Sequence, residues 1–395
     1  MPAQEIPPTS KLFQPLKVGR ITLPHRIVMA PLSRYRNSDD HVPLDMAVEY
    51  YSDRATVPGT LIISEATAIS QDDETDPNGP GIWSEKEITQ WKRIISAVHA
   101  RGSYFMQQIW SLGRAGDAQF ARSKSIKYAS SSASPMEGSD ITPEELTEEE
   151  IWVKIDGFAQ AAKTAIAAGA DGVELHGAHG YLIDQFTRDS INKRTDKWGG
   201  SVENRARFAI EAVKAVVAAV GAERTAIRLS PWATFQGATS SDPLAQFIYM
   251  LREFKRLNLN LGYIHLVEAT GDPVTWLHKK EEDLGQHKAY GQNTLLYLLE
   301  EWDNWSPVII AGGYTAENVF PAVDSLYSKW DIAVAFGRYF ISNPDLVFRL
   351  QNGITLSPYK RETFYTKKTP VGYIDYPVSE EFWTETGPAT QNVKS

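Results

Sequence analysis

Short apolar runs rich in β-branched residues alternate along the chain with longer segments of helical period. Eight of these runs have the length and composition of buried strands. They cover residues 27–29, 61–64, 104–109, 172–176, 225–229, 263–267, 308–311 and 332–336. Between them, apolar positions recur at helical spacing, most clearly over residues 85–100, 147–168, 202–220 and 242–257.

Polar residues that can cap a helix stand at the start of several helical segments. Their side chains accept hydrogen bonds from the unpaired N–H groups of a first helical turn. Glu150 follows Thr147 by three residues, which is the spacing of a capping box. The predicted N-caps are Ser84, Thr147, Ser201, Ser241 and Thr315.

Eight strand–helix units in succession are typical of a closed (β/α)₈ barrel of the α/β class. The alternative, an open doubly wound sheet, usually has a glycine-rich turn after its first strand, whereas residues 30–34 here read APLSR. We therefore predict a TIM barrel, formed by residues 1–395 as a single domain. Residues 1–20 would form an irregular or hairpin lead-in, and residues 356–395 a C-terminal tail on the outside.

The composition narrows the range of partners. Apolar residues make up 42% of the chain, enough to fill a large core, and the formal net charge is −9 with no basic run for phosphates to contact. No apolar stretch reaches the roughly 18 residues that a membrane span needs. The first residues, MPAQEIPPTSK, lack the basic and apolar regions of a secretory signal. We expect no nucleic acid partner, no membrane segment and a cytoplasmic location.

The chain contains no cysteine. This excludes disulfides, thiolate nucleophiles, iron–sulfur clusters and cysteine-ligated zinc. Any redox chemistry would therefore depend on a bound organic cofactor.

Barrel enzymes carry their catalytic residues at the C-terminal ends of the strands. The absence of lysine at these positions argues against a Schiff-base aldolase or a pyridoxal enzyme. His176 and His179 could supply two metal ligands, but no carboxylate stands at an obvious partner spacing, so we expect no metal. The strand-end residues are Ser33, Glu65, Gln108, Trp110, His176, Arg228, Ser230, Glu268, Thr270, Gly312 and Arg338.

Two glycine-containing pairs follow the last two predicted strands. Gly312 with Gly313, and Gly337 with Arg338, stand where barrels commonly bind phosphate through backbone N–H groups. Arg338 could add charge-assisted hydrogen bonds. Either pair alone would be explained equally well by a tight turn. Together they favour a phosphorylated cofactor.

Residues 176–205, HGAHGYLIDQFTRDSINKRTDKWGGSVENR, place two imidazoles and a phenol within six residues after a predicted strand. Glu174 and His176 share one face of that strand. His176, His179 and Tyr181 suit a reaction that holds a carbonyl oxygen and delivers a proton. From the residues alone, a core histidine network with a packing tyrosine is an equally good explanation.

Together with other segments, this block resembles the old yellow enzymes, FMN-dependent reductases built on a (β/α)₈ barrel. The resemblance covers nearly the whole chain. The matching segments are 13–19 (FQPLKVG), 26–32 (RIVMAPL), 108–110 (QIW), 176–205, 228–231 (RLSP), 337–346 (GRYFISNPDL) and 372–377 (GYIDYP).

The resemblance implies that FMN lies across the mouth of the barrel. Its implied contacts are Pro31, Leu32, Ser33 and Ala66 on the isoalloxazine, Gln108 on the pyrimidine edge, Arg228 near N1, Gly312, Gly313, Gly337 and Arg338 on the phosphate, and Phe364 and Tyr365 over the dimethylbenzene side. Positive charge near N1 stabilises reduced, anionic flavin. A buried structural pair is the alternative explanation for Gln108 and Arg228.

The resemblance also implies an ene-reductase. NADPH would reduce the bound FMN, and an α,β-unsaturated carbonyl compound, an enone or enal, would then bind beside Trp110. His176 and His179 would donate hydrogen bonds to its oxygen, hydride would pass from flavin N5 to the β-carbon, and Tyr181 would protonate the α-carbon. The alternatives are another FMN barrel oxidoreductase or a noncatalytic flavin-binding barrel. The expected state is a monomer or homodimer.

Several positions depart from the commonest family pattern. Ser33 replaces threonine, His25 replaces asparagine, and Tyr314 follows Gly313. The loop 71–80, QDDETDPNGP, is acidic and lacks the aromatic residue often found there. Because that loop would border the substrate, the preferred enone is open. Segments 232–242 and 270–286, the second containing Trp276, are expected to form mobile walls of the substrate site.

Overall fold

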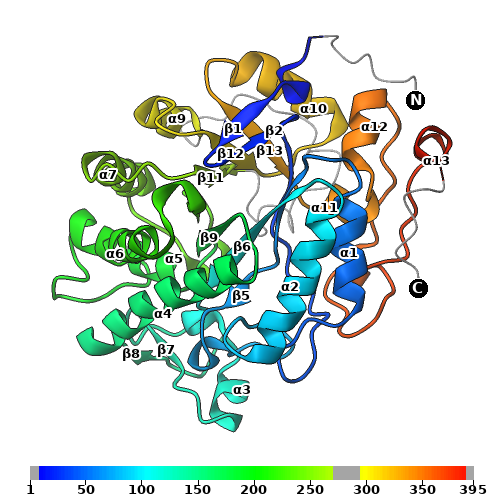
Figure 1. The fold of residues 1–395 in the computed structure, drawn as a ribbon. Helices are drawn as coiled ribbons and strands as arrows, with labels where there is room; N and C mark the ends of the chain where they lie inside the picture. The colour runs from blue at the N-terminus through cyan, green and yellow to red at the C-terminus, as the bar shows by residue number, and fades with distance from the viewer. Residues whose placement is uncertain (1–8, 270–293, 388–395) are drawn as a thin grey trace.

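The computed structural model describes residues 9–269 and 294–387. Eight parallel strands form a closed ring, because β4 pairs with β6 and β13 pairs with β3 (Figure 1). The predicted (β/α)₈ barrel is confirmed, and each predicted strand overlaps one barrel strand. These are β3 (Ile27–Met29), β4 (Leu61–Ile63), β6 (Tyr104–Trp110), β9 (Gly172–Gly177), β10 (Thr225–Leu229), β11 (Tyr263–Val267), β12 (Val308–Ala311) and β13 (Ile332–Phe336).

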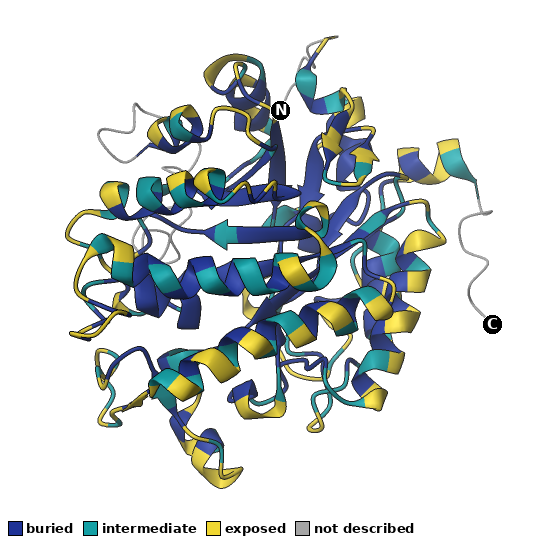
Figure 2. Ribbon diagram, turned by 60° about the vertical axis from the view of Figure 1, so that its left-hand side comes forward, coloured by how far each residue is buried: buried dark blue, intermediate teal, exposed yellow. Residues whose placement is uncertain are grey.

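Helices surround the ring and bury one face each, as the dark inner and yellow outer faces in Figure 2 show. In α4, for example, Ile151, Ile155 and Phe158 recur at helical spacing and are buried. None of the helices in the described ranges is long and apolar enough to cross a membrane. The longer helices are α1 (Met46–Arg54), α2 (Glu85–His99), α4 (Glu148–Ala167), α6 (Val202–Val220), α7 (Pro243–Arg256), α9 (Leu296–Trp302) and α12 (Leu346–Asn352).

Four of the five predicted N-caps are confirmed. Ser84, Thr147 and Thr315 form capping boxes, and the Ser201 side chain accepts a hydrogen bond from a backbone N–H of the first turn. The prediction for Ser241 is wrong: Asp242 caps α7, and its carboxylate accepts the Ala245 N–H at 2.9 Å. Proline at position 243 favours this later start, because it fits the first helical position, where no N–H is needed.

The amino-terminal lead-in is a hairpin of β1 (Leu16–Val18) and β2 (Ile21–Leu23) at the N-terminal end of the barrel. Its apolar side chains join the cluster that fills the barrel interior. The turn requires Gly19, which has φ 53°, and a Cβ there would lie 2.1 Å from the Glu223 carbonyl oxygen. The hairpin closes one end of the barrel, so a ligand can approach from the other.

Shorter elements that the hydrophobic pattern did not predict occupy the loops. Short β5 extends the sheet beside β6, and β7 and β8 form a separate parallel pair. The remaining elements are β5 (Thr67–Ala68), β7 (Ala129–Ser130), β8 (Glu144–Glu145), α3 (Ala118–Ser123), α5 (Leu182–Thr187), α10 (Ala316–Pro321), α11 (Arg338–Ser342), α13 (Glu380–Thr386), η1 (Lys11–Phe13), η2 (Gln71–Asp73), η3 (Gly113–Ala115), η4 (Ala222–Arg224), η5 (Phe235–Gly237), the π-turn η8 (Ala322–Leu326) and η9 (Arg361–Thr363).

The C-terminal tail packs against α1 and the loop after β3. Tyr373 is fully buried, and its ring stacks on Tyr50 with centroids 4.0 Å apart. Arg34 donates to the Gly372 carbonyl oxygen at 2.7 Å, and Arg36 donates to that of Val371 at 3.0 Å. The tail therefore holds the first strand-end loop in place.

Candidate active site

Four rings gather above the C-terminal ends of β6 and β9. Trp110 ends β6, His176 lies near the end of β9, and Tyr181 is the N-cap residue of α5. The His176 ring centroid lies 4.8 Å from that of Tyr181, 5.9 Å from that of His179 and 5.8 Å from that of Trp110. The structure thus brings together the predicted catalytic residues and the predicted substrate contact Trp110.

The turn that carries the two histidines has a strained backbone. His179 has φ 57° and Gly180 has φ 78°, and a non-glycine residue in this region costs about 1 kcal/mol or more. Two hydrogen bonds hold the turn: the His179 N–H donates to Ser230 Oγ at 2.8 Å, and the Gly180 N–H donates to Asp184 Oδ2 at 2.9 Å. The backbone of the turn that carries the His179 imidazole is therefore fixed by its surroundings.

Both histidines are neutral. Burial lowers the pKa of His176 and of His179 well below 6.5, and the nearby positive charge of Arg228 lowers it further. The Ala178 N–H donates to Nδ1 of His176 at 3.3 Å, so the neutral ring carries its proton on Nε2. Nε2 of His179 is buried and has no hydrogen-bond partner among the described residues. The pair can hold a ligand oxygen without becoming charged.

A polar network fills the barrel beneath these rings. Nε2 of Gln108 donates to Glu174 Oε1 at 2.6 Å. The other Glu174 oxygen accepts from the Tyr263 hydroxyl at 2.8 Å and from His265 Nδ1 at 2.9 Å. The network fixes the side-chain amide of Gln108, and no described residue donates to its Oε1. Oε1 of Gln108 is therefore available to accept a hydrogen bond from a ligand.

Arg228 supplies the positive charge of this network. Burial raises the pKa of Glu174, but interactions with His265, Arg228 and Tyr263 lower it by more. The pKa of Glu174 therefore lies below its usual value. Burial also lowers the pKa of His265, so we assign a neutral His265 and a Glu174 carboxylate balanced by Arg228. Nε of Arg228 is buried without a partner in the described part of the chain. Its N–H is available to a ligand.

The four residues predicted to line the isoalloxazine lie at the ends of β3 and β4. Ala66 is buried in one cluster with Trp110, against which Tyr181 packs. Leu32 contacts the start of α11, because a Cβ at Gly337 would lie 3.2 Å from Leu32 Cδ2. Pro31 is buried and Ser33 is partly exposed on the same loop. Ala66 therefore lies on the side of the four rings, and Leu32 lies on the side of the predicted phosphate site.

The predicted phosphate residues follow β12 and β13. Gly312 and Gly313 have φ 128° and 76°, a backbone conformation that residues with a side chain rarely adopt, so the turn after β12 requires glycine. Gly337 precedes α11, and Arg338 at its start donates to the Tyr359 hydroxyl at 2.9 Å. These residues can hold a phosphate.

Phe364 and Tyr365 lie apart from each other. The Phe364 ring is buried with its centroid 5.5 Å from Tyr359, on the Arg338 side. Tyr365 is 64% exposed, and its ring lies 6.0 Å from that of Tyr35. Of the two residues, only Phe364 contacts the phosphate side of the site, whereas Tyr365 lies beside the substrate loops.

Two of the strand-end carboxylates are structural. Burial raises the pKa of Glu65 to about 7, and its Oε2 accepts the Arg34 N–H at 3.1 Å. Burial likewise raises the pKa of Glu268 to about 7, and its Oε1 accepts the hydroxyl protons of Tyr314 at 2.8 Å and Tyr327 at 2.6 Å. Tyr314, which departs from the family pattern, thus anchors the loop containing Gly313.

Sequence reasoning missed several residues beside the four rings. Gln236, with φ 60° in the segment 232–242, hydrogen-bonds the Tyr181 phenol through its side chain. Tyr35 donates to Asp76 Oδ2 at 2.6 Å. In the lumen, Tyr263 and His265 were missed, although their alternate spacing on a predicted strand indicated one shared face. The strand-end residue Thr270 and the predicted wall 270–286, with Trp276, lie outside the described residues.

The family model described as the NADH:flavin oxidoreductase / NADH oxidase family matches residues 11–357. This match covers most of the chain and includes every barrel strand. The protein therefore belongs to this family of flavin-dependent oxidoreductases, which includes the old yellow enzymes.

Individual relatives agree with this assignment. The chanoclavine-I aldehyde reductase fgaOx3 of Penicillium roqueforti is 50% identical over 94% of this chain and 98% of its own. The NADP-dependent oxidoreductase lnbE of Aspergillus flavus is 47% identical over 94% and 97%. A probable inactive reductase, easA of Epichloe festucae var. lolii, is 43% identical over 95% and 97%. The old yellow enzyme homologue from Zymomonas mobilis superposes with a TM-score of 0.82 at 37% identity, covering 93% of this chain and 100% of that one.

The cofactors of the family are FMN and a nicotinamide nucleotide. The site fits FMN, because it offers hydrogen-bonding groups that the described residues leave open. These are Nε of Arg228 and Oε1 of Gln108. In the described ranges, no group of three or more carboxylate or imidazole side chains is placed to hold a metal ion.

Proposed function

We propose that the protein is an ene-reductase that uses NADPH to reduce the C=C bond of α,β-unsaturated carbonyl compounds. The observation that carries the proposal is the neutral, buried pair His176 and His179 beside the Tyr181 phenol. The pair suits an oxygen that gains negative charge, and the phenol supplies a proton close by. The NADP-dependent relative supports NADPH as the reductant.

Bound FMN would supply hydride at N5. His176 and His179 hold the carbonyl oxygen of the substrate. Because the oxygen gains negative charge during transfer, donors that are already in place stabilise the transition state more than the ground state. Neutral imidazoles suit this task, since their N–H groups need no protonation step at neutral pH.

Tyr181 delivers the proton to the α-carbon. Burial raises the pKa of its phenol above 10, the negative charge of Asp76 raises it further, and the hydrogen bond from Gln236 lowers it in part. The phenol therefore stays protonated throughout the neutral range. It can protonate a strongly basic carbon, and solvent must then replace its proton.

The test uses flavin-loaded protein, NADPH and cinnamaldehyde under nitrogen, in D₂O. We expect the saturated aldehyde, with deuterium at the α-carbon, and recovery of the oxidised flavin colour as the substrate is consumed. The allylic alcohol as the product would overturn C=C reduction. Deuterium absent from the α-carbon would remove Tyr181 as its proton donor.

Two alternatives give different outcomes in the same experiment. A noncatalytic barrel, which the name of the Epichloe relative raises, would bind flavin without NADPH consumption. Another type of FMN oxidoreductase would accept electrons from a nicotinamide nucleotide but stay reduced when the enal is added. Parallel reactions with NADH decide the nucleotide preference.

A further inference from the structure

The acidic loop 71–80 is anchored on both sides of Asp76. Before it, the Thr75 carbonyl oxygen accepts the Asp117 N–H at 2.8 Å. After it, Asn78 and Asn37 exchange side-chain-to-backbone hydrogen bonds at 2.8 and 3.1 Å. The position of Asp76 is therefore set by the fold, although its side chain is partly exposed.

Asp76 lies among the aromatic residues of the active site. Its Oδ2 accepts the Tyr35 hydroxyl proton at 2.6 Å, and the Tyr35 ring contacts that of Tyr365 edge-on, with centroids 6.0 Å apart. Its negative charge is also close enough to Tyr181 to raise the pKa of that phenol, after burial. Asp76 therefore faces the same region as the proposed proton donor.

The second carboxylate oxygen of Asp76 remains open. Within residues 9–269 and 294–387, Oδ1 makes no hydrogen bond, and the cation that acts on Asp76 most strongly is the exposed Lys367. The exposed Asp117 adds a second negative charge nearby. This edge of the active site is thus negative, with one carboxylate oxygen unused.

We propose that Asp76 selects substrates that carry a protonated amine at a distance from the reacting carbonyl group, an inference that rests on the proposed ene-reductase function. Oδ2 stays on Tyr35, and Oδ1 accepts a hydrogen bond from the ammonium group. The rings of Tyr35 and Tyr365 can contact the carbon substituents of the amine and favour its charge. The substrate class is therefore cationic enals and enones.

The test compares two substrates of the same shape, 4-(dimethylaminomethyl)cinnamaldehyde and 4-isobutylcinnamaldehyde, in the flavin-loaded enzyme. We expect the native enzyme to prefer the cation. In Asp76→Asn, kcat/KM for the cation should fall about 10-fold or more, chiefly through KM, while the neutral aldehyde changes less than about 2-fold. Asparagine retains an acceptor for the Tyr35 hydroxyl, so the loop stays in place.

Asp72→Asn is the matched control, because it removes the same charge from an exposed position of the same loop. It should leave the preference for the cation unchanged. Equal losses for both aldehydes in Asp76→Asn would mean a purely structural role and would overturn the inference. So would an unchanged preference, or a loss of the same size in Asp72→Asn.

A binding measurement separates this inference from the proposed function. Titration calorimetry with 4-(dimethylaminomethyl)phenol and 4-isobutylphenol requires no turnover. Tighter binding of the cationic phenol that is lost in Asp76→Asn would support amine recognition even if neither aldehyde is reduced. Equal affinities in native protein and variant would contradict it even if both aldehydes are reduced.

Discussion

Residues 176–205 consist of two unequal parts, 176–181 and 182–205, called here the first and second half, and these satisfy their polar groups in opposite ways. In the first half, His179 has a left-handed backbone, and its Nε2 is buried with no partner among the described residues. In the second half, Arg188 donates through Nε to Asp184 and through its Nη atoms to the carbonyl oxygens of Ser230 and Pro231. The first half leaves the His179 imidazole open, whereas the buried arginines of the second half are satisfied; Trp198 Nε1, which is buried without a partner among the described residues, is the exception.

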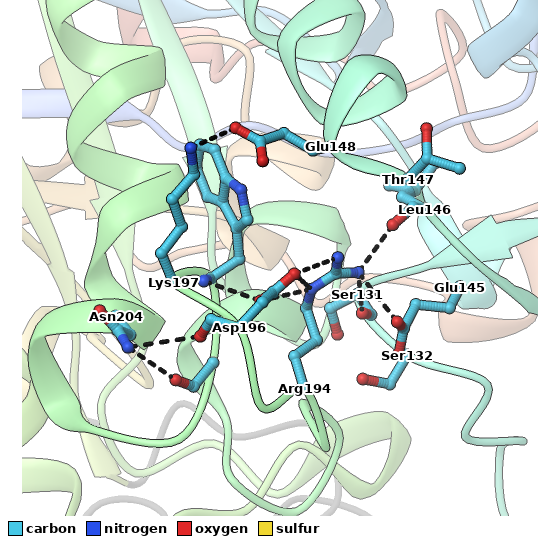
Figure 3. Close-up of polar contacts among 12 residues, drawn as sticks. Ser131, Ser132, Glu145, Leu146, Thr147, Glu148, Arg194, Asp196, Lys197 and Asn204 are labelled. Atoms are coloured by element: carbon cyan, nitrogen blue, oxygen red, sulfur yellow. Dashed lines mark hydrogen bonds and ion pairs between the residues drawn. The ribbon is translucent and has the colours of Figure 1, made fainter.

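Arg194 shows how completely the second half is tied down (Figure 3). Its Nη1 donates to the carbonyl oxygens of Leu146 at 2.7 Å and Ser131 at 3.1 Å, and its Nη2 donates to Asp196 Oδ2 at 2.7 Å. Leu146 and Ser131 belong to the long segment that connects β6 to α4. Arg194 therefore joins that connecting segment to the loop before α6.

The difference assigns a functional role to the first half of the motif and a structural role to the second. Buried polar groups without partners are rare in folded proteins and mark places that a ligand completes, whereas a satisfied network sets the fold. We therefore expect substitutions in the first half to lower turnover and leave stability intact. Substitutions in the second half should do the reverse.

The largest expected effect follows removal of one imidazole. His179→Ala should slow reoxidation of the reduced flavin by an enone about 10² to 10³-fold, because one donor to the developing oxyanion is lost. His179→Asn should recover at least about 10-fold of this loss, since its amide donates and asparagine tolerates a left-handed backbone. Stopped-flow absorbance measures the rate, and equal rates in native protein and His179→Ala would refute the assignment.

Replacement of the phenol should have a somewhat smaller effect on the same step. Tyr181→Phe should lower alkene reduction by about 10²-fold, because the proton donor is lost while the ring still packs against Trp110 and His176. Flavin reduction by NADPH, measured separately in the absence of alkene, should keep its native rate. Unchanged turnover in this variant would remove Tyr181 from its role.

A substitution in the second half should change stability instead. Arg194→Ala leaves the Leu146 and Ser131 carbonyl oxygens without their donor, and we expect a loss of about 2–3 kcal/mol in the free energy of unfolding. Lys197→Ala is the control from the same loop, since Lys197 pairs with Glu148 on the surface and should matter by less than about 0.5 kcal/mol. Denaturant titration measures both.

The second measurement of this test is the turnover of Arg194→Ala per folded, flavin-loaded molecule. It should stay near the native value in Arg194→Ala. If the variant keeps its stability but loses turnover, Arg194 belongs with the first half, and the proposed difference between the two halves is wrong.

The sequence predicts the barrel well because its strands are buried on both faces and read as apolar runs. It also predicts that His176, His179 and Tyr181, the proposed catalytic residues, are neighbours, since they lie close together in the chain. Two polar residues of the lumen, Tyr263 and His265, were not assigned. They interrupt an otherwise apolar run, and the pattern does not show what they contact across the barrel.

Loop residues were the least predictable. Gln236 and Asp76 reach the site through loops whose path depends on tertiary anchors such as the Asn37–Asn78 pair. No periodic pattern encodes such anchors. The shift of the α7 cap from Ser241 to Asp242 has a local cause, because both residues can cap and only the following proline distinguishes them.

The smallest expected effect is a pH dependence of stability. Burial lowers the pKa of both His176 and His179, so the folded protein keeps them neutral while the unfolded chain binds protons below pH 6.5. Because the unfolded state then binds more protons, unfolding free energy falls as the pH falls. From pH 7 to pH 6 each histidine should lower the free energy of unfolding by about 0.7 kcal/mol.

Denaturant titrations at both pH values, with excess FMN, should show a smaller loss of unfolding free energy in the double variant His176→Asn with His179→Asn than in the native protein. An identical pH dependence would mean that the imidazoles can take up protons in the folded site, and they could then not serve as the neutral donors that distinguish the first half from the second.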